Sequence, residues 1–197
     1  MIVPPFAVNL RLAAMLNILL TSIRVVVIAA VPAMAVHAAA PEAHSAGDIP
    51  DSQVFVQFSS PLGYSIKVPE GWARREGRGM VRFEDKFLSV QIAMAPRAAA
   101  PTVGGIRNNE LVALERSERA VRIVKVEPAT LPAGPVIEVR YAAESAPNPV
   151  TNKAVRLDCV SHYAWRAGQM ATVRFCAPAG ADNADQWALM ARSFKWK

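Results

Sequence analysis

Two cysteines on either side of one tight turn constrain this fold more than any other feature of the sequence. Cys159 and Cys176 lie in two strand-like stretches, and the clearest turn between them is Ala167-Gly168. Counting outward from a two-residue turn places the cysteines directly opposite each other, in a non-hydrogen-bonded pair. Cα atoms in such pairs lie about 4.5–5.5 Å apart, which a disulfide can span. The sequence therefore predicts an antiparallel hairpin closed by a Cys159–Cys176 disulfide.

A structural role for these cysteines is favoured over a redox or metal-binding role. A redox-active pair is typically a CxxC motif at a helix N-terminus, and the two cysteines are not spaced in that way. His162 lies three residues after Cys159, so on a strand the two side chains point to opposite faces. Two thiolates without a third ligand do not make a zinc site. We therefore expect no metal site and no cofactor.

Residues 1–38 have the pattern of a cleaved signal peptide. Arg24 follows a long uncharged stretch, an apolar segment covers residues 25–31, and small residues come next, up to Ala38. We expect cleavage near Ala38 and export of the mature protein. The two cysteines agree with a periplasmic or secreted location, because disulfides persist in oxidising compartments.

Two alternatives remain open for this segment. Translation can begin at Met1 or at Met15, and a start at Met15 gives a signal peptide of more usual length. Residues 12–40 could also stay attached as a membrane anchor, and only then would the protein contact the membrane. Arg24 and Pro32 disfavour that anchor, because a charge and a helix break are both unfavourable in a spanning helix.

The sequence predicts that the mature chain is one small domain with modest net charge. Residues 39–52 are rich in Ala, Pro and polar residues and predict a flexible lead-in, and residues 53–197 predict a single domain. The net charge of the whole chain is only +6 and its basic residues are scattered. We therefore expect no nucleic-acid partner.

Alternating and β-branched stretches dominate the predicted domain, and helical spacing occurs in two places. The expected strands and helices define an α+β fold in which a largely antiparallel sheet is flanked by helices. The strands are expected at residues 54–58, 64–68, 80–84, 88–94, 120–126, 136–142, 154–165 and 170–177, and the helices at residues 108–119 and 181–196.

The sequence contains no convincing catalytic constellation. Asp158, Ser161 and His162 are the residue types of a hydrolase triad, but on one strand Ser161 and His162 point to opposite faces. Asp158 and His162 would lie about 13 Å apart at ~3.3 Å per residue. We therefore predict no catalytic residues and do not expect an enzyme.

One stretch is a candidate binding surface. Trp72 is followed by Arg74, Arg75 and Arg78 in a segment that also contains glycines, which predicts a basic loop beside an aromatic side chain. The acidic corner at residues 84–85 could bind a cation weakly, although a solvated corner is the simpler interpretation. The sequence thus predicts a surface for a ligand or partner around Trp72.

The segment from Gly63 to Trp72 carries the motif G-Y-x-I-x-x-P-x-x-W, and the last predicted helix ends in Ser193-Phe194. With the order of predicted elements over residues 54–196, these motifs resemble the PsbP-like fold family of small exported bacterial proteins, which includes PsbP, DcrB and LpqN. The resemblance implies an αβα sandwich and a function that, in most members of the family, is not catalytic. It supplies no shared catalytic residues, and the disulfide is not a general feature of the family.

The leading hypothesis is a non-catalytic periplasmic or secreted accessory module that binds another envelope protein and is itself a monomer. The first alternative is a carrier of a small ligand or metal ion, and the second is an enzyme of unrecognised type. Binding surfaces have no local sequence pattern comparable to a catalytic motif, so the partner and pathway are not specified.

Overall fold

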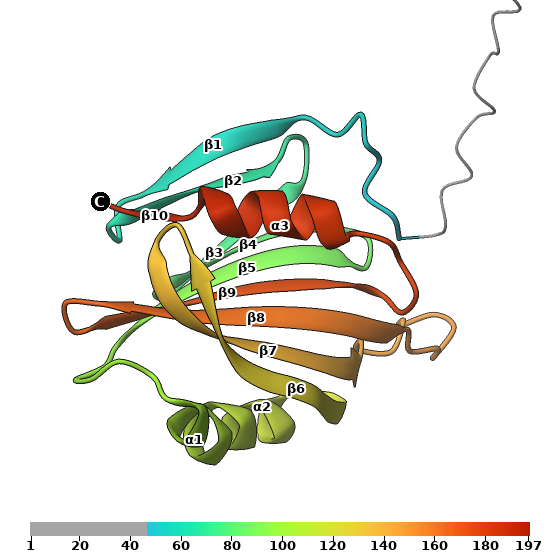
Figure 1. Cartoon of the computed structure of the whole chain (residues 1–197). Coiled ribbons are helices and arrows are strands. Elements are labelled where there is room, and N and C mark those ends of the chain that lie inside the picture. The colour runs from blue at the N-terminus through green and yellow to red at the C-terminus, as the bar shows by residue number, and fades with distance from the viewer. Residues whose placement is uncertain (1–46) are drawn as a thin grey trace, which may run out of the picture. The chain divides into compact units, whose positions relative to one another are not determined.

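A seven-stranded antiparallel sheet forms the centre of the protein (Figure 1). The computed structural model describes residues 47–197, so the predicted signal peptide at residues 1–38 and most of the predicted lead-in lie outside the described residues. The strands, in their order across the sheet, are β3 (Ala73–Gly77), β4 (Met80–Asp85), β5 (Leu88–Pro96), β9 (Gln169–Pro178), β8 (Arg156–Arg166), β7 (Gly134–Glu144) and β6 (Arg119–Leu131).

A second layer covers one face of this sheet. It consists of β1 (Phe55–Ser60), β2 (Tyr64–Pro69), the two-residue strand β10 (Lys195–Trp196) and the helix α3 (Ala184–Ser193), which lies beside β2 (Figure 1). The larger of the two cores lies between the layers, with aromatic side chains at its centre. Fully buried members include Tyr64, Phe175 and Phe194.

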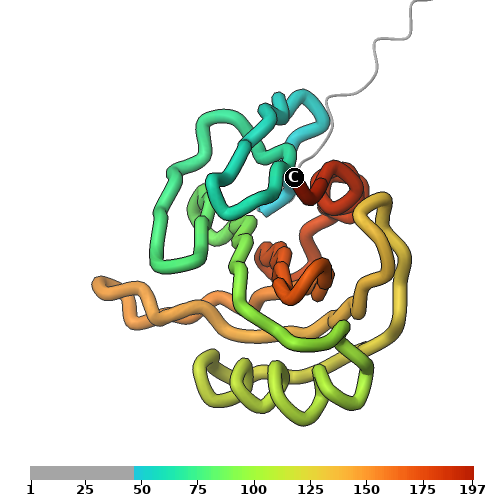
Figure 2. Tube along the Cα trace, turned by 90° about the vertical axis from the view of Figure 1, so that its left-hand side faces the viewer, coloured from blue at the N-terminus to red at the C-terminus, as the bar shows by residue number. Residues whose placement is uncertain are grey.

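The opposite face of the large sheet is covered by a short, irregular helical segment (Figure 2). It consists of one turn α1 (Val103–Gly105), a π-helical turn η1 (Ile106–Glu110) and α2 (Leu111–Ser117). A second core, which contains both cysteines, packs between this segment and the sheet. The result is the predicted α+β fold with an antiparallel sheet between helical layers. Within residues 47–197, no helix is long and apolar enough to cross a membrane.

The register predicted for the cysteine hairpin is confirmed. Ala167 and Gly168 form the two-residue turn between β8 and β9, and both have positive φ angles, 47° and 81°. Positive φ at both central residues is the requirement of a type I′ turn. Cys159 lies directly opposite Cys176 with a Cα–Cα distance of 4.3 Å, and a disulfide joins them.

The segment predicted as a basic loop after Trp72 is instead the edge strand β3, which pairs with β4 along its whole length. All five of its residues are exposed. The sequence shows no apolar alternation here because an edge strand with polar side chains buries little surface, which also protects the edge from pairing with another chain. The prediction of a loop was therefore wrong.

The final helix is shorter than predicted. It ends at Ser193, and Lys195-Trp196 then pair with β2 as a strand. The Ser193 hydroxyl accepts a hydrogen bond from the Lys67 backbone N–H at 2.7 Å. It thereby provides a partner for a backbone donor of β2 that lies beyond the residues paired with β10. The apolar spacing to Trp196 reflects burial in the same core rather than one continuous helix.

The end of the predicted lead-in is held against the domain. Ile49 is buried in the larger core, and its backbone N–H donates to the side chain of Asn183 at 2.6 Å. Asn183 precedes α3, but its side chain makes no cap hydrogen bond to the helix and instead binds the backbone of residues 47 and 49. At residues 47–52, the lead-in is therefore an ordered strap and not a flexible linker.

Candidate functional site

Among the four residues predicted as a binding surface, Arg74 and Arg75 point to opposite faces of the sheet, and Arg78 lies in the turn between β3 and β4. Along β3 the side chains alternate, so Arg74 lies opposite Phe83, a core residue, and Arg75 lies opposite Arg82 on the other face. The Arg74 guanidinium lies 4.7 Å from the Phe58 ring centroid, an arrangement that favours cation–π attraction. The basic side chains are therefore divided between two faces of the sheet.

Trp72, however, lines a cleft of about 550 Å³, which we call the Trp72 cleft. Its walls come from the ordered strap, from the turn between β4 and β5, and from the end of β9. The lining residues are Gly47, Asp48, Ile49, Pro50, Gln53, Trp72, Asp85, Lys86, Phe87, Leu88, Val155 and Pro178. The strap thus builds one wall of the cleft.

The Trp72 cleft presents apolar surface inside a charged rim. Trp72 is partly buried and packs against the larger core. Phe87 lies in the tight turn between β4 and β5, where its side chain is 41% exposed. Asp85 and Lys86 stand beside it at the rim. An apolar floor with a polar rim is the usual arrangement of a binding site for an apolar group.

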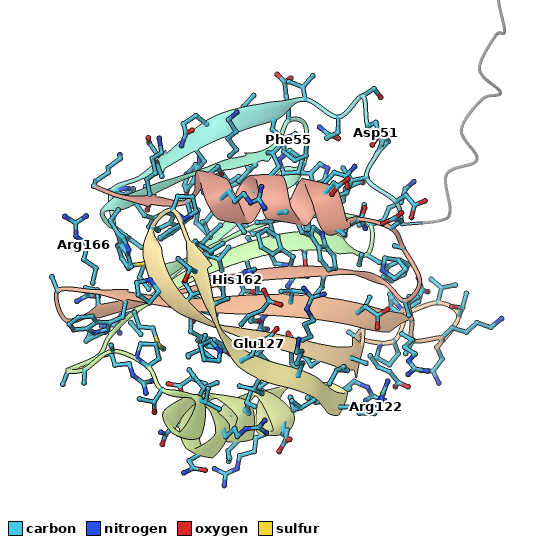
Figure 3. All side chains as sticks on the ribbon, in the orientation of Figure 1. Asp51, Phe55, Arg122, Glu127, His162 and Arg166 are labelled. Carbon is cyan, nitrogen blue, oxygen red and sulfur yellow. A yellow bond between two sulfur atoms is a disulfide. The ribbon has the colours of Figure 1, made fainter. Side chains whose placement is uncertain are left out.

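A second cleft, of about 400 Å³, lies between α3 and strands β6, β7 and β8; we call it the His162 cleft. His162 is in the middle of the sheet (Figure 3). Its Nε2 lies 3.1 Å from Oε2 of Glu138, directly opposite on β7. The other carboxylate oxygen of Glu138 accepts a hydrogen bond from Arg140 Nε at 2.7 Å. The cleft floor is therefore a His–Glu–Arg chain.

The electrostatics of this chain keep Glu138 ionised. The hydrogen bond from His162 lowers the pKa of Glu138 to about 2, burial opposes this, and Arg140 adds to the lowering. The His162 ring packs edge-on against Phe175, which in turn stacks on Trp187. These contacts fix the orientation of the imidazole in the cleft.

The geometry separates the residues of the hydrolase-like trio. Ser161 faces the opposite side of the sheet from His162, where it is fully buried. Asp158 accepts a hydrogen bond from the Gly180 backbone N–H. His162 is instead oriented by Glu138, a residue that no sequence motif marks. A long connection joins β7 to β8. The sequence therefore has no tight turn that would fix the register of these strands and predict that Glu138 lies opposite His162.

In the acidic corner at residues 84–85, Glu84 is already paired with two arginines. Glu84 forms ion pairs with Arg75 and with Arg82, one through each carboxylate oxygen. These partners lower the pKa of Glu84, with the hydrogen bond from Arg75 as the largest cause. Among residues 47–197, no group of three or more His, Cys, Asp or Glu side chains is placed to hold a metal ion.

The fold can be compared with known structures. No protein-family model matches the chain, and no curated protein sequence matches it. The solution structure of cyanobacterial PsbP (CyanoP) from Synechocystis sp. PCC 6803 is similar over 78% of this chain and 98% of that chain, with 15% identity and a TM-score of 0.51. The Ran-binding protein Mog1p of Saccharomyces cerevisiae covers 73% of this chain at 11% identity, over 95% of its own length, with a TM-score of 0.46. The similarity to CyanoP agrees with the motif-based expectation, and the chain has a PsbP-like fold.

Proposed function

We propose that this protein is an exported, non-catalytic accessory module that binds another envelope protein through the Trp72 cleft. The observation that carries the proposal is the exposure of Phe87, which is 41% exposed and lines the same cleft as Trp72. Burying the remaining exposed part of this aromatic side chain against a partner would stabilise a complex by about 1 kcal/mol through apolar area alone. Aromatic side chains of this kind are the usual energetic centre of a protein interface.

The structure of the cleft favours a protein partner over a freely diffusing ligand. Phe87 projects from a turn, so it can enter a partner's surface while the cleft receives an apolar side chain in return. Asp85 and Lys86 at the rim can pair with polar groups that surround such a contact. Export is supported by the disulfide between Cys159 and Cys176, which suits an oxidising compartment.

The test is site-specific photocrosslinking in cells. A photoreactive amino acid at position 87 of the full chain is expected to trap one envelope protein, identified by mass spectrometry. In the matched control, the photoreactive group replaces Val124, which is 60% exposed on the edge strand β6. We expect position 124 to trap nothing reproducible.

Binding to the trapped partner is then measured with purified proteins. Phe87→Ser is expected to weaken it at least about tenfold, as loss of an aromatic anchor does, and Val124→Ser to leave it unchanged. Phe87→Ser is preferred to a Trp72 variant because Trp72 also packs against the core. Equal crosslinking at both positions, or equal affinity of the two variants, would refute the proposed surface. A small molecule that raises the melting temperature of wild type but not of Phe87→Ser would favour a ligand carrier.

A further inference from the structure

A second surface, whose residues differ from those of the Trp72 cleft, contains three positively charged side chains that form no ion pair with another described residue. A hollow of about 560 Å³ runs along α3 beside β1 and β2; we call it the α3 hollow. Its lining residues are Gln57, Lys67, Asp185, Ala188, Leu189, Arg192, Ser193 and Lys195. Three of these carry positive charge and one carries negative charge.

The three cations are brought together by the backbone. Lys195 lies opposite Ser65, two residues from Lys67, so Lys195 and Lys67 are diagonal neighbours on one face of the small sheet. The hydrogen bond from the Lys67 N–H to the Ser193 hydroxyl, 2.7 Å long, brings the end of α3 and Arg192 to the same place. The hollow is therefore positive at the end where α3 meets β2.

No carboxylate side chain in the described part of the chain forms an ion pair with these cations. The side chains of Lys67, Arg192 and Lys195 are exposed, and none makes an ion pair or hydrogen bond with another residue in the range 47–197. The single carboxylate, Asp185, lies two helical turns from Arg192, about 10 Å at ~1.5 Å per residue. Like charges held together repel one another, and an anionic partner relieves that repulsion.

The hollow also offers apolar surface between its charged ends. Leu189 is 41% exposed, and Ala188 lies beside it in the hollow. An elongated hollow with apolar surface at its centre and cations at one end matches an extended peptide that carries several carboxylates and one apolar side chain. Electrostatic complementarity of this kind governs partner choice and association rate.

We propose that the α3 hollow binds an acidic segment of a protein partner, with Lys67, Arg192 and Lys195 contacting carboxylates and Leu189 contacting an apolar side chain. This surface is separate from the Trp72 cleft and does not depend on it. The probe is a short fluorescein-labelled peptide rich in glutamate with a single leucine, and its binding to the exported protein is followed by fluorescence anisotropy. A peptide with glutamine in place of glutamate serves as the uncharged probe.

The double variant K67E/K195E is expected to bind the acidic peptide at least about tenfold more weakly than wild type, and wild-type binding is expected to weaken as salt rises. The matched control is R122E/R166E, which changes charge equally at two exposed arginines that lie away from α3 (Figure 3). It is expected to bind like wild type. The uncharged peptide is expected to bind weakly to all three proteins.

Three outcomes would overturn the proposal. Equal loss of binding in K67E/K195E and R122E/R166E would indicate attraction to net charge alone. Unchanged binding by K67E/K195E would exclude the hollow. Binding of wild type to vesicles of anionic phospholipid, with no binding to the acidic peptide, would indicate a lipid surface instead. A failure of Phe87 crosslinking would leave all of these results unaffected.

Discussion

At the scale of single residues, the pairing of Glu138 with His162 changes the ionisation of a carboxylate in the sheet. The pKa of Glu138 is about 2, below its usual 4.5, because His162 and Arg140 stabilise the carboxylate. A lowered pKa means that the carboxylate stabilises the fold fully above pH 4.5. That stabilisation is lost as the pH falls through about 2.

Glu138→Gln is therefore expected to lower the free energy of unfolding by about 2 kcal/mol at neutral pH, the usual worth of a hydrogen-bonded buried charge. The difference from wild type is expected to shrink as the pH falls from 4.5 towards 2. Urea denaturation at several pH values measures both effects. Glu127→Gln is the control, because Glu127 pairs with Lys125 at the surface and its loss should change stability by less than about 0.5 kcal/mol. A deficit in Glu138→Gln that did not change with pH would contradict this account.

Whether a residue contact could be predicted from the sequence depended on the nearest turn. Cys159 and Cys176 were paired correctly because a two-residue turn fixes the register of every residue along its two strands. The contact between Glu138 and His162 crosses from β7 to β8, whose connection is long and does not define a register. The same strand therefore contains one contact that the sequence predicts and one that it does not.

At the scale of elements, the β8–β9 hairpin is closed by the disulfide. Cys159→Ser removes a cross-link that closes a 17-residue separation, for which the chain-entropy model gives about 3 kcal/mol. We expect a lower melting temperature and, in size-exclusion chromatography, an unchanged monomer. Wild type treated with reductant is expected to melt like the variant. An unchanged melting temperature in Cys159→Ser would mean that the hairpin is equally stable without the bond.

The strap at residues 47–52 is a second element whose stability can be tested separately. Asn183 is buried, accepts from the Ile49 N–H and donates to the Gly47 carbonyl at 2.9 Å. Asn183→Ala leaves these backbone groups without partners, so it is expected to release the strap at a cost of about 2 kcal/mol. Hydrogen exchange at Ile49 is expected to become faster. Gln186→Ala, which removes only an exposed contact with Asp51, is expected to leave exchange at Ile49 unchanged. Equal exchange in both variants would rule out this role of Asn183.

Elements were predictable where burial imposes a pattern, and less so where it does not. The core strands β5, β8 and β9 have apolar alternation or long apolar runs, and their positions were predicted to within a few residues. The edge strand β3 is polar and exposed throughout, so its sequence is typical of a loop. The strand β10 depends on pairing with β2 and on the Ser193–Lys67 contact, which are tertiary features without a local signal.

At the scale of the whole molecule, the remaining prediction is that export, directed by the amino-terminal segment, is required for formation of the disulfide. Residues 1–38 predict export, and the Cys159–Cys176 bond needs an oxidising compartment to form and persist. When the full chain is produced in a Gram-negative host, we expect it in the periplasmic fraction with both cysteines oxidised. Its mass is expected to show cleavage near Ala38.

Deletion of residues 2–38 is the matched test, because it removes the export signal but leaves every described residue in place. We expect this shorter chain in the cytosol with two thiols that react with maleimide, and a lower melting temperature until it is oxidised in vitro. Oxidation should then restore the melting temperature of the exported protein, because the hairpin register already holds the cysteines opposite each other. Recovery of the full chain in the membrane fraction with its amino-terminal segment intact would instead identify that segment as an anchor, and an oxidised cytosolic chain would separate the disulfide from export.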